Sequence, residues 1–85
     1  MKHASAAALD ALGPLLEVLR QHSDLKERSR GVFYRRGRAC LHFHEDLSGL
    51  YADLRLPNET DFTRLPVNDE DGRLALLARL DGLGA

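Results

Sequence analysis

Two short glycine-containing turns constrain this chain more than any other feature of its sequence. They separate three runs, GVFYR, ACLHFHE and LYADLRL, in which apolar residues tend to alternate with polar ones. A period of two is typical of β-strands. The first turn is Arg36-Gly37 and the second is the loop 46–49. Because connections this short join antiparallel neighbours, residues 31–56 predict an antiparallel β-meander.

The lengths of the two turns also predict a register. A two-residue turn pairs Phe33 with Cys40, and a four-residue loop pairs His42 with Asp53. Both registers agree on an apolar face, which consists of Val32, Tyr34, Ala39, Leu41, Phe43, Leu50, Ala52 and Leu54. The opposite face, called the polar face below, consists of Phe33, Arg35, Cys40, His42, His44, Tyr51, Asp53 and Arg55. Since a slip of one residue would invert a whole strand, this agreement supports the architecture.

Leucines at helical spacing flank the meander on both sides. The two stripes are Leu9, Leu12, Leu16 and Leu19 at the N-terminal end, and Leu74, Leu77 and Leu80 at the C-terminal end. Ser5 and Asn68 are the expected N-caps. Gly13-Pro14 is expected to kink the first helix or to start it afresh, because proline removes a backbone hydrogen bond.

The remaining segments carry weaker signals. Residues 1–4 are expected to be frayed and residues 22–30 to be irregular. The segment FTRLPV, residues 62–67, is a candidate fourth strand, although Pro66 suits only a sheet edge or a strand end. We therefore predict one α+β domain over residues 1–85, an antiparallel three- to four-stranded β-meander packed on one face by an N-terminal and a C-terminal helix.

Charge, cysteine content and length exclude several classes of protein. A net charge of −1 excludes a generally basic nucleic-acid binder. The single cysteine, Cys40, excludes an internal disulfide and a cysteine-based zinc cluster. No apolar run approaches the roughly 20 residues of a membrane span, and no signal-peptide segment is evident. We expect a cytoplasmic protein, and the excess of Arg over Lys suggests a bacterial source.

Positive charge is concentrated in KERSRGVFYRRGR, residues 26–38, which contain six Lys or Arg and one Glu. We predict an anion or nucleic-acid site here, at Arg30, Phe33, Arg35, Arg36 and Arg38. Arginine binds phosphate, and exposed rings such as Phe33 stack on the bases of single-stranded RNA. A solvated hairpin without a ligand is the alternative interpretation.

His42, His44 and Asp53 are low-probability candidates for a metal site. Alternate residues of a strand project to the same side about 6.6 Å apart, so two imidazoles can converge on one ion, with Asp53 as an oxygen ligand. The favoured interpretation is structural: His42 pairs with Asp53, which would raise the pKa of His42, and His44 stacks on Tyr51. We predict no catalytic residue and no cofactor, because so small an open sheet offers little concavity.

The polar face is also a candidate interaction surface. Its proposed contact residues are Phe33, His42, His44, Tyr51, Asp53 and Arg55. Tyr, Phe and Arg are enriched in protein interfaces. Because the core of a chain this short is small, we expect a homodimer formed through this face or through an edge strand, and a protein or RNA partner is an alternative.

The segments FYRRGRA, LHFHED and ADLRL together resemble a group of short uncharacterised bacterial proteins. The resemblance covers residues 31–67 best and implies a self-contained bacterial domain without a known activity. From the residues themselves we expect a non-enzymatic binding or interaction module that acts through its open sheet face and basic hairpin. Single-stranded nucleic-acid binding and a His-x-His metal site are the alternative functions.

Overall fold

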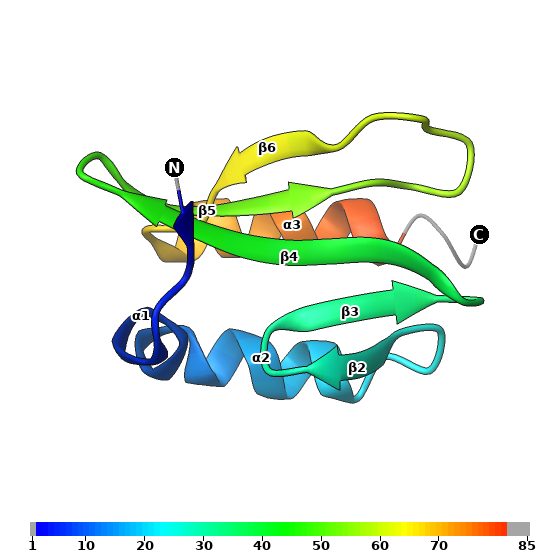
Figure 1. The fold of residues 1–85 in the computed structure, drawn as a ribbon, viewed down its shortest axis with the longest axis horizontal. Coiled ribbons are helices and arrows are strands. Elements are labelled where there is room, and N and C mark those ends of the chain that lie inside the picture. Colours follow the sequence, from blue (N-terminus) through cyan, green and yellow to red (C-terminus); the bar gives the residue numbers. More distant parts are fainter. Residues whose placement is uncertain (1, 82–85) are drawn as a thin grey trace.

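A curved antiparallel sheet organises the chain, and the computed structural model describes residues 2–81. In chain order the elements are β1 (Lys2–His3), α1 (Ala6–Ala11), α2 (Gly13–Arg20), β2 (Lys26–Ser29), β3 (Val32–Arg35), β4 (Arg38–Asp46), β5 (Gly49–Leu54), β6 (Thr63–Pro66) and α3 (Glu70–Asp81). Strands β2 to β6 lie side by side in sequence order, and β1 pairs with β4 (Figure 1). The predicted α+β fold with an antiparallel sheet is confirmed, with more strands than the three or four expected.

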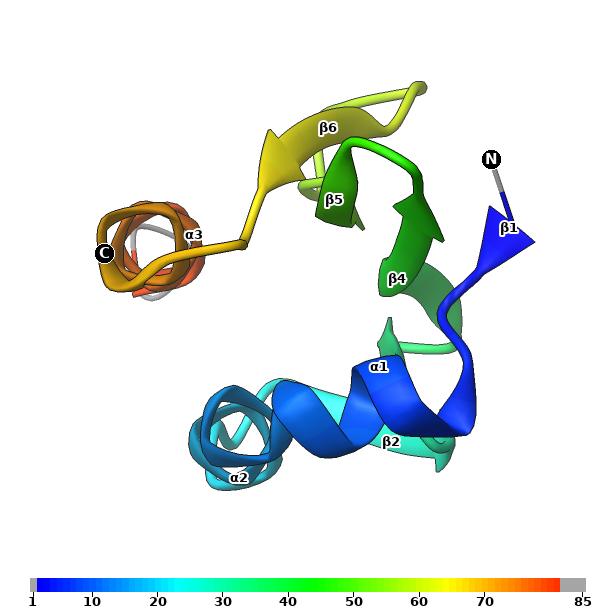
Figure 2. The same ribbon diagram turned by 90° about the vertical axis from the view of Figure 1, so that its left-hand side faces the viewer.

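The sheet bends around the helices. In Figure 2 α2 and α3 lie on its concave side, and β1 lies on the side away from α3. The core between sheet and helices is mostly leucine, with Phe33, Phe43 and Val67 as its other large residues. Since α2 and α3 both lie on the concave side, neither of them covers the opposite side of the sheet.

The N-terminal helical segment breaks where the sequence predicts. Ser5 caps α1, because its Oγ accepts a hydrogen bond from the amide of Ala8 at 3.2 Å. The chain leaves α1 at Leu12 and starts α2 with Gly13-Pro14, where proline needs no backbone donor. Leu12, like the other leucines of the predicted stripe, is buried.

The predicted register of β4 and β5 is confirmed along its whole length. The observed pairs are Leu41–Leu54, His42–Asp53, Phe43–Ala52, His44–Tyr51, Glu45–Leu50 and Asp46–Gly49. Asp46 and Gly49 also pair, so the turn consists of Leu47 and Ser48 and is two residues shorter than the predicted loop 46–49. Gly49 begins β5 with φ at 135°, a backbone conformation that favours glycine. The shorter turn leaves the predicted register unchanged, and His42 and Asp53 lie opposite each other.

The predicted register of β3 and β4 is wrong beyond the turn. Phe33 pairs with Leu41 instead of Cys40, because a β-bulge leaves Cys40 as an extra residue on β4. Phe33 consequently leaves the predicted polar face and is fully buried in the core, whereas Val32 is only partly buried. Burying a phenylalanine side chain is worth about 1.5–3 kcal/mol, which favours the bulged arrangement over a regular ladder that exposes the ring.

Two strands form where none was expected. Lys2–His3 is β1 and is not frayed, and Lys26–Ser29 is β2 within the segment expected to be irregular. The amide of Ala4 donates to the carbonyl of Phe43 at 3.1 Å, which holds the N-terminal segment against β4. Both strands are short and polar, so neither shows the apolar alternation from which strands are predicted.

The segment after β5 resolves two further expectations. Thr63–Pro66 is β6 and pairs with β5, so the candidate fourth strand exists. Asn68 is not the N-cap of α3, because its Oδ1 accepts a hydrogen bond from the amide of Leu50 at 2.7 Å. The carboxylate of Asp69 caps the helix and accepts a hydrogen bond from the amide of Gly72 at 2.9 Å.

We predict that Phe33→Ala lowers the free energy of unfolding by about 3–5 kcal/mol, because Phe33 is fully buried in the core. Urea denaturation followed by circular dichroism measures the effect. Val18→Ala is the control, since Val18 is 50% exposed and its truncation should change stability by less than about 0.5 kcal/mol. Equal losses in the two variants would contradict the buried position of Phe33.

Gly13 and Gly49 predict opposite effects of substitution by alanine. Gly13→Ala should stabilise the protein by at most about 0.4–1 kcal/mol, because a Cβ at this helical position meets no atom within 4 Å apart from its chain neighbours and its own helix backbone. Contact of that Cβ with Pro14 reduces the gain. Gly49→Ala should cost more than about 1 kcal/mol, because φ is positive there and the Cβ would collide with the side chain of Asn68. Thermal unfolding of both variants beside the wild type shows the two signs.

Candidate functional site

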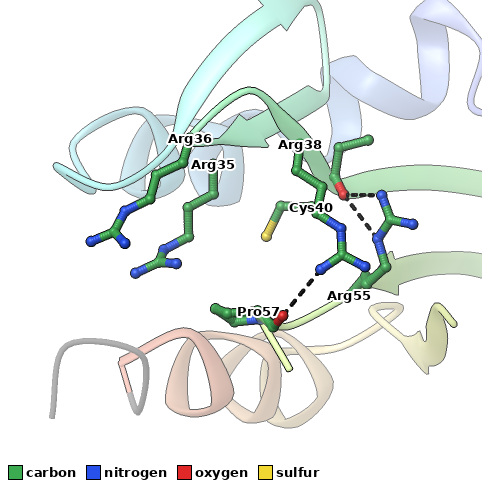
Figure 3. Close-up of a pocket in the computed structure, with 7 residues that line it drawn as sticks. Arg35, Arg36, Arg38, Cys40, Arg55 and Pro57 are labelled. Atoms are coloured by element: carbon green, nitrogen blue, oxygen red, sulfur yellow. Dashed lines mark hydrogen bonds between the residues drawn. The ribbon is translucent and has the colours of Figure 1, made fainter. Parts of the chain in front are cut away.

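Four arginines surround a small pocket at one end of the β3–β4 hairpin. The pocket has a volume of about 220 Å³ and is lined by Arg35, Arg36, Arg38, Ala39, Cys40, Arg55 and Pro57 (Figure 3). Arg35 ends β3, Arg36 and Gly37 form the turn, and Arg38 begins β4. Arg55 follows the last residue of β5, which lies on the other side of β4. We call this the arginine pocket.

Backbone carbonyl groups hold two of these guanidinium groups in place. Arg38 donates through Nη1 to the carbonyl of Pro57 at 3.1 Å and through Nη2 to that of Glu59 at 2.6 Å. Arg55 donates through Nε and Nη2 to the carbonyl of Ala39, at 3.2 and 2.8 Å. A neutral carbonyl orients a guanidinium group without cancelling its charge, so these contacts position positive charge at the pocket.

Arg35 is partly buried, like Arg55, whereas Arg36 and Arg38 are exposed. Its side chain is 15% exposed, and its one carboxylate neighbour, Asp24, lies 4.0 Å from Nη2. Its Nε is buried and has no hydrogen-bond partner among the described residues. A buried charged donor without a partner is costly, which makes this nitrogen a natural contact for an anion.

Cys40 contributes its side chain to the same pocket. In Figure 3 its sulfur lies between Arg35 and Arg38. Burial raises the pKa of the Cys40 thiol above its ordinary value, while Arg35, Arg55 and Arg38 oppose the rise. The thiol is therefore protonated near neutral pH and is not an activated nucleophile.

We predict slow alkylation of Cys40 in the folded protein, because its side chain is buried and its thiol is protonated. A thiol-specific chromogenic reagent should react at least about tenfold faster after unfolding in urea, since the nucleophile is the exposed thiolate. Free cysteine in the same urea concentration provides the reference rate. Equal rates in folded and unfolded protein would contradict the burial of this thiol.

The structure separates the five residues predicted for the anion site. Arg35, Arg36 and Arg38 lie together at the arginine pocket, whereas Arg30 forms an ion pair with Asp10 and Phe33 is in the core. Arg55 was predicted for the polar face and instead joins the pocket. The sequence gives no local signal for this, because Arg55 reaches the hairpin only through the pairing of β4 with β5.

The polar face is more enclosed than predicted. The side chains of His42, His44 and Asp53 are 19%, 13% and 8% exposed. The Phe62 ring covers His42 with 4.7 Å between ring centroids, and the His3 ring stacks on His44 at 4.8 Å. With Phe33 in the core, the proposed interaction surface also loses one of its two aromatic residues.

Asp53 has a stronger partner than the predicted His42. Arg64 on β6 donates from Nε to Oδ1 at 2.7 Å and from Nη2 to Oδ2 at 2.8 Å. The hydrogen bonds from Arg64 lower the pKa of Asp53, against the opposing effect of burial. A bidentate pair of this kind fixes the orientation of the carboxylate.

The predicted rise in the pKa of His42 is wrong. Burial, followed by the neighbouring His44, lowers the pKa of His42 below its ordinary value, and the attraction of Asp53 is too weak to reverse the shift. The effect of Asp53 on His42 is weak because Nδ1 of His42 lies 4.0 Å from Oδ2 of Asp53, while Arg64 holds that carboxylate. The favoured His42–Asp53 ion pair is therefore only a distant contact.

His3, His42 and His44 form a cluster in which each ring offers one nitrogen within 4.8 Å of the others. Nε2 of His44 lies 2.8 Å from Nδ1 of His42 and 3.2 Å from Oδ2 of Asp53. His3 was not predicted to be part of any site. These three rings, with Asp53 beside them, are the residues that could hold a metal ion, and we call them the histidine cluster.

Tyr51 is not the ring that stacks on His44, contrary to the prediction. Its hydroxyl is 2.6 Å from the hydroxyl of Ser48 in the β4–β5 loop. The ring that stacks on His44 belongs to His3, with an angle of 26° between the planes. The N-terminal strand therefore takes the place that was expected for Tyr51.

Comparisons with protein families, with curated proteins and with solved structures find no match to this chain. Within residues 2–81, no helix is long and apolar enough to cross a membrane. The function is therefore inferred from the geometry of the chain itself.

Proposed function

We propose that the protein is a non-enzymatic binding module that takes an anionic group into the arginine pocket. The observation that carries this proposal is that four arginines line one pocket of about 220 Å³. Like charges gathered in this way repel one another, and an anion between them relieves the repulsion. Arg35 adds a buried Nε without a partner.

The arginines of this pocket differ from others in the chain. Four of the six other arginines form ion pairs with carboxylates, at Arg20–Glu17, Arg20–Glu27, Arg30–Asp10, Arg64–Asp53 and Arg79–Glu59. Within residues 2–81 the only ion pair of a pocket arginine is the 4.0 Å contact of Arg35 with Asp24. The pocket therefore retains positive charge that is neutralised at the other sites.

The ligand best matched to this site carries a phosphate group. The planar guanidinium fork pairs with phosphate oxygens through two parallel hydrogen bonds, and several forks around one pocket suit a compact anion with several oxygens. A volume of about 220 Å³ accommodates a group of the size of pyrophosphate and not an extended chain. We therefore propose a small phosphate-bearing ligand.

The position of the aromatic rings disfavours the RNA alternative. Phe33 is buried, and the guanidinium carbon of Arg28 lies 5.0 Å from the centroid of the Tyr34 ring. Neither ring of the hairpin is thus free to stack on a base, whereas stacking supplies much of the affinity for single-stranded nucleic acid. The pocket can hold one phosphate group without such stacking.

Titration of the protein with inorganic pyrophosphate, followed by calorimetry and by NMR of the arginine Nε–Hε groups, tests the proposal. Arg36→Asn removes one charge from the pocket, and asparagine tolerates the φ of 52° at this turn position. We expect the dissociation constant to rise roughly tenfold or more, because a hydrogen bond to a charged group contributes about 1.5–3 kcal/mol.

Arg30→Asn is the matched control, since it removes the same charge from the same basic segment but outside the pocket. It should change the dissociation constant by less than about threefold once salt screens distant charges. Equal losses in both variants, or no binding of pyrophosphate, would refute the proposed pocket. Binding of a short single-stranded RNA without any binding of pyrophosphate would favour the nucleic-acid alternative.

A further inference from the structure

We infer that the histidine cluster is a binding site for one divalent transition-metal ion of the zinc type, with His3, His42 and His44 as ligands and Asp53 as the adjacent carboxylate. The chain contains four histidines, and three of them lie together in this cluster. They come from two segments far apart in the sequence. The site is separate from the arginine pocket and does not depend on the function proposed for it.

Backbone pairing builds the cluster. The β1–β4 pairing places His3 directly opposite His44, and His42 lies two residues before His44 on the same strand. In Figure 1 β1 lies beside the end of β4 that precedes the β4–β5 loop. Residues opposite one another, and alternate residues of one strand, share a face of the sheet. The three rings are thus brought together by the regular geometry of the sheet.

The distances suit a shared ion. Two ligand atoms that bind one zinc ion tetrahedrally at 2.0–2.1 Å lie about 3.3 Å apart. Nε2 of His44 lies 2.8 Å from Nδ1 of His42 and 3.2 Å from Oδ2 of Asp53, both somewhat shorter than that spacing. One nitrogen from each of the three rings lies within 4.8 Å of the others, so side-chain rotations can bring all three onto one ion.

The two nitrogens of His44 have different surroundings. Nε2 faces Nδ1 of His42 at 2.8 Å, so it is the atom that would bind a shared ion. Nδ1 is buried and has no hydrogen-bond partner within residues 2–81. Since the two nitrogens of an imidazole ring point in different directions, an ion at Nε2 does not satisfy Nδ1, and the inference rests on the convergence of the three rings.

The surroundings resemble the support that metal ligands need. Arg64 fixes the carboxylate of Asp53 through two hydrogen bonds, and the negative charge of Asp53 offsets the charge of a cation beside it. The ring of Phe62 packs against His42 and shields one side of the cluster. His3 is exposed, so an ion can enter from the solvent on that side.

The donor set selects the type of ion. Imidazole nitrogens suit zinc, cobalt, nickel and copper, whereas magnesium and calcium prefer oxygen ligands throughout. Three protein nitrogens with one nearby carboxylate match zinc in particular. The tetrahedral preference of zinc is shared by cobalt(II), whose visible absorption makes it the more convenient probe.

Titration of the full chain with Co²⁺, followed by displacement with Zn²⁺, tests the inference. We expect tetrahedral Co²⁺ absorption that saturates at one ion per chain and disappears when Zn²⁺ is added. Binding of Zn²⁺ should also raise the melting temperature, because the ion binds only the folded arrangement. Mg²⁺ at the same concentration should leave both signals unchanged.

His3→Ala is the decisive variant, because His3 is exposed on a two-residue strand and its loss should not unfold the protein. It should weaken Zn²⁺ binding by at least about tenfold, since even the groups behind metal ligands are worth 10–100-fold. His22→Ala removes the remaining histidine outside the cluster and should change the affinity by less than about twofold. Circular dichroism confirms that both variants are folded.

Three outcomes would overturn the inference. The first is no saturable binding of Co²⁺ or Zn²⁺ to the wild type. The second is an unchanged affinity in His3→Ala, which would leave at most an ordinary pair of surface histidines. The third is one ion per two chains, which would place the ion between molecules instead of within this cluster.

Discussion

The pairing of β4 with its neighbours fixes the positions of both the arginine pocket and the histidine cluster. β4 is the longest strand, and it pairs with β5 on one side and with β3 and then β1 on the other. Its residues alternate between the core and the open face, so it carries Leu41 and Phe43 inward while His42 and His44 face outward. The arginine pocket lies at its beginning and the histidine cluster near its end. One strand thus supports both the proposed anion site and the proposed metal-ion site.

The parts of the structure that follow from local rules could be predicted from the sequence. The position of the turn between β4 and β5, together with the apolar alternation, is sufficient to predict the register that places His42 opposite Asp53, even though the turn is shorter than predicted. The same rules fail at Cys40, where β4 carries a bulge. A bulge forms when the free energy gained by burying Phe33 exceeds the free energy lost with the regular hydrogen bonds between the strands. That balance involves the helices, which lie elsewhere in the sequence.

The composition of each site depends on contacts between distant segments. His3 reaches His44 only because β1 pairs with β4, and a two-residue polar strand has no periodicity to reveal it. Arg64 reaches Asp53 through β6 and holds its carboxylate. Burial and the neighbouring His44 lower the pKa of His42, against the direction expected from two strands alone. Sequence patterns indicate which residue types could bind a ligand, and the tertiary structure decides which of these residues come into contact.

The two outermost strands of the meander have a consequence for the behaviour of the protein at high concentration. An open sheet edge exposes unpaired backbone groups onto which another chain can add a strand, and this is a route to aggregation. β2 consists of Lys26, Glu27, Arg28 and Ser29, and β6 ends at Pro66, which has no amide hydrogen to donate. Charge at one edge and proline at the other oppose strand addition, so the sheet is protected from extending into a fibril.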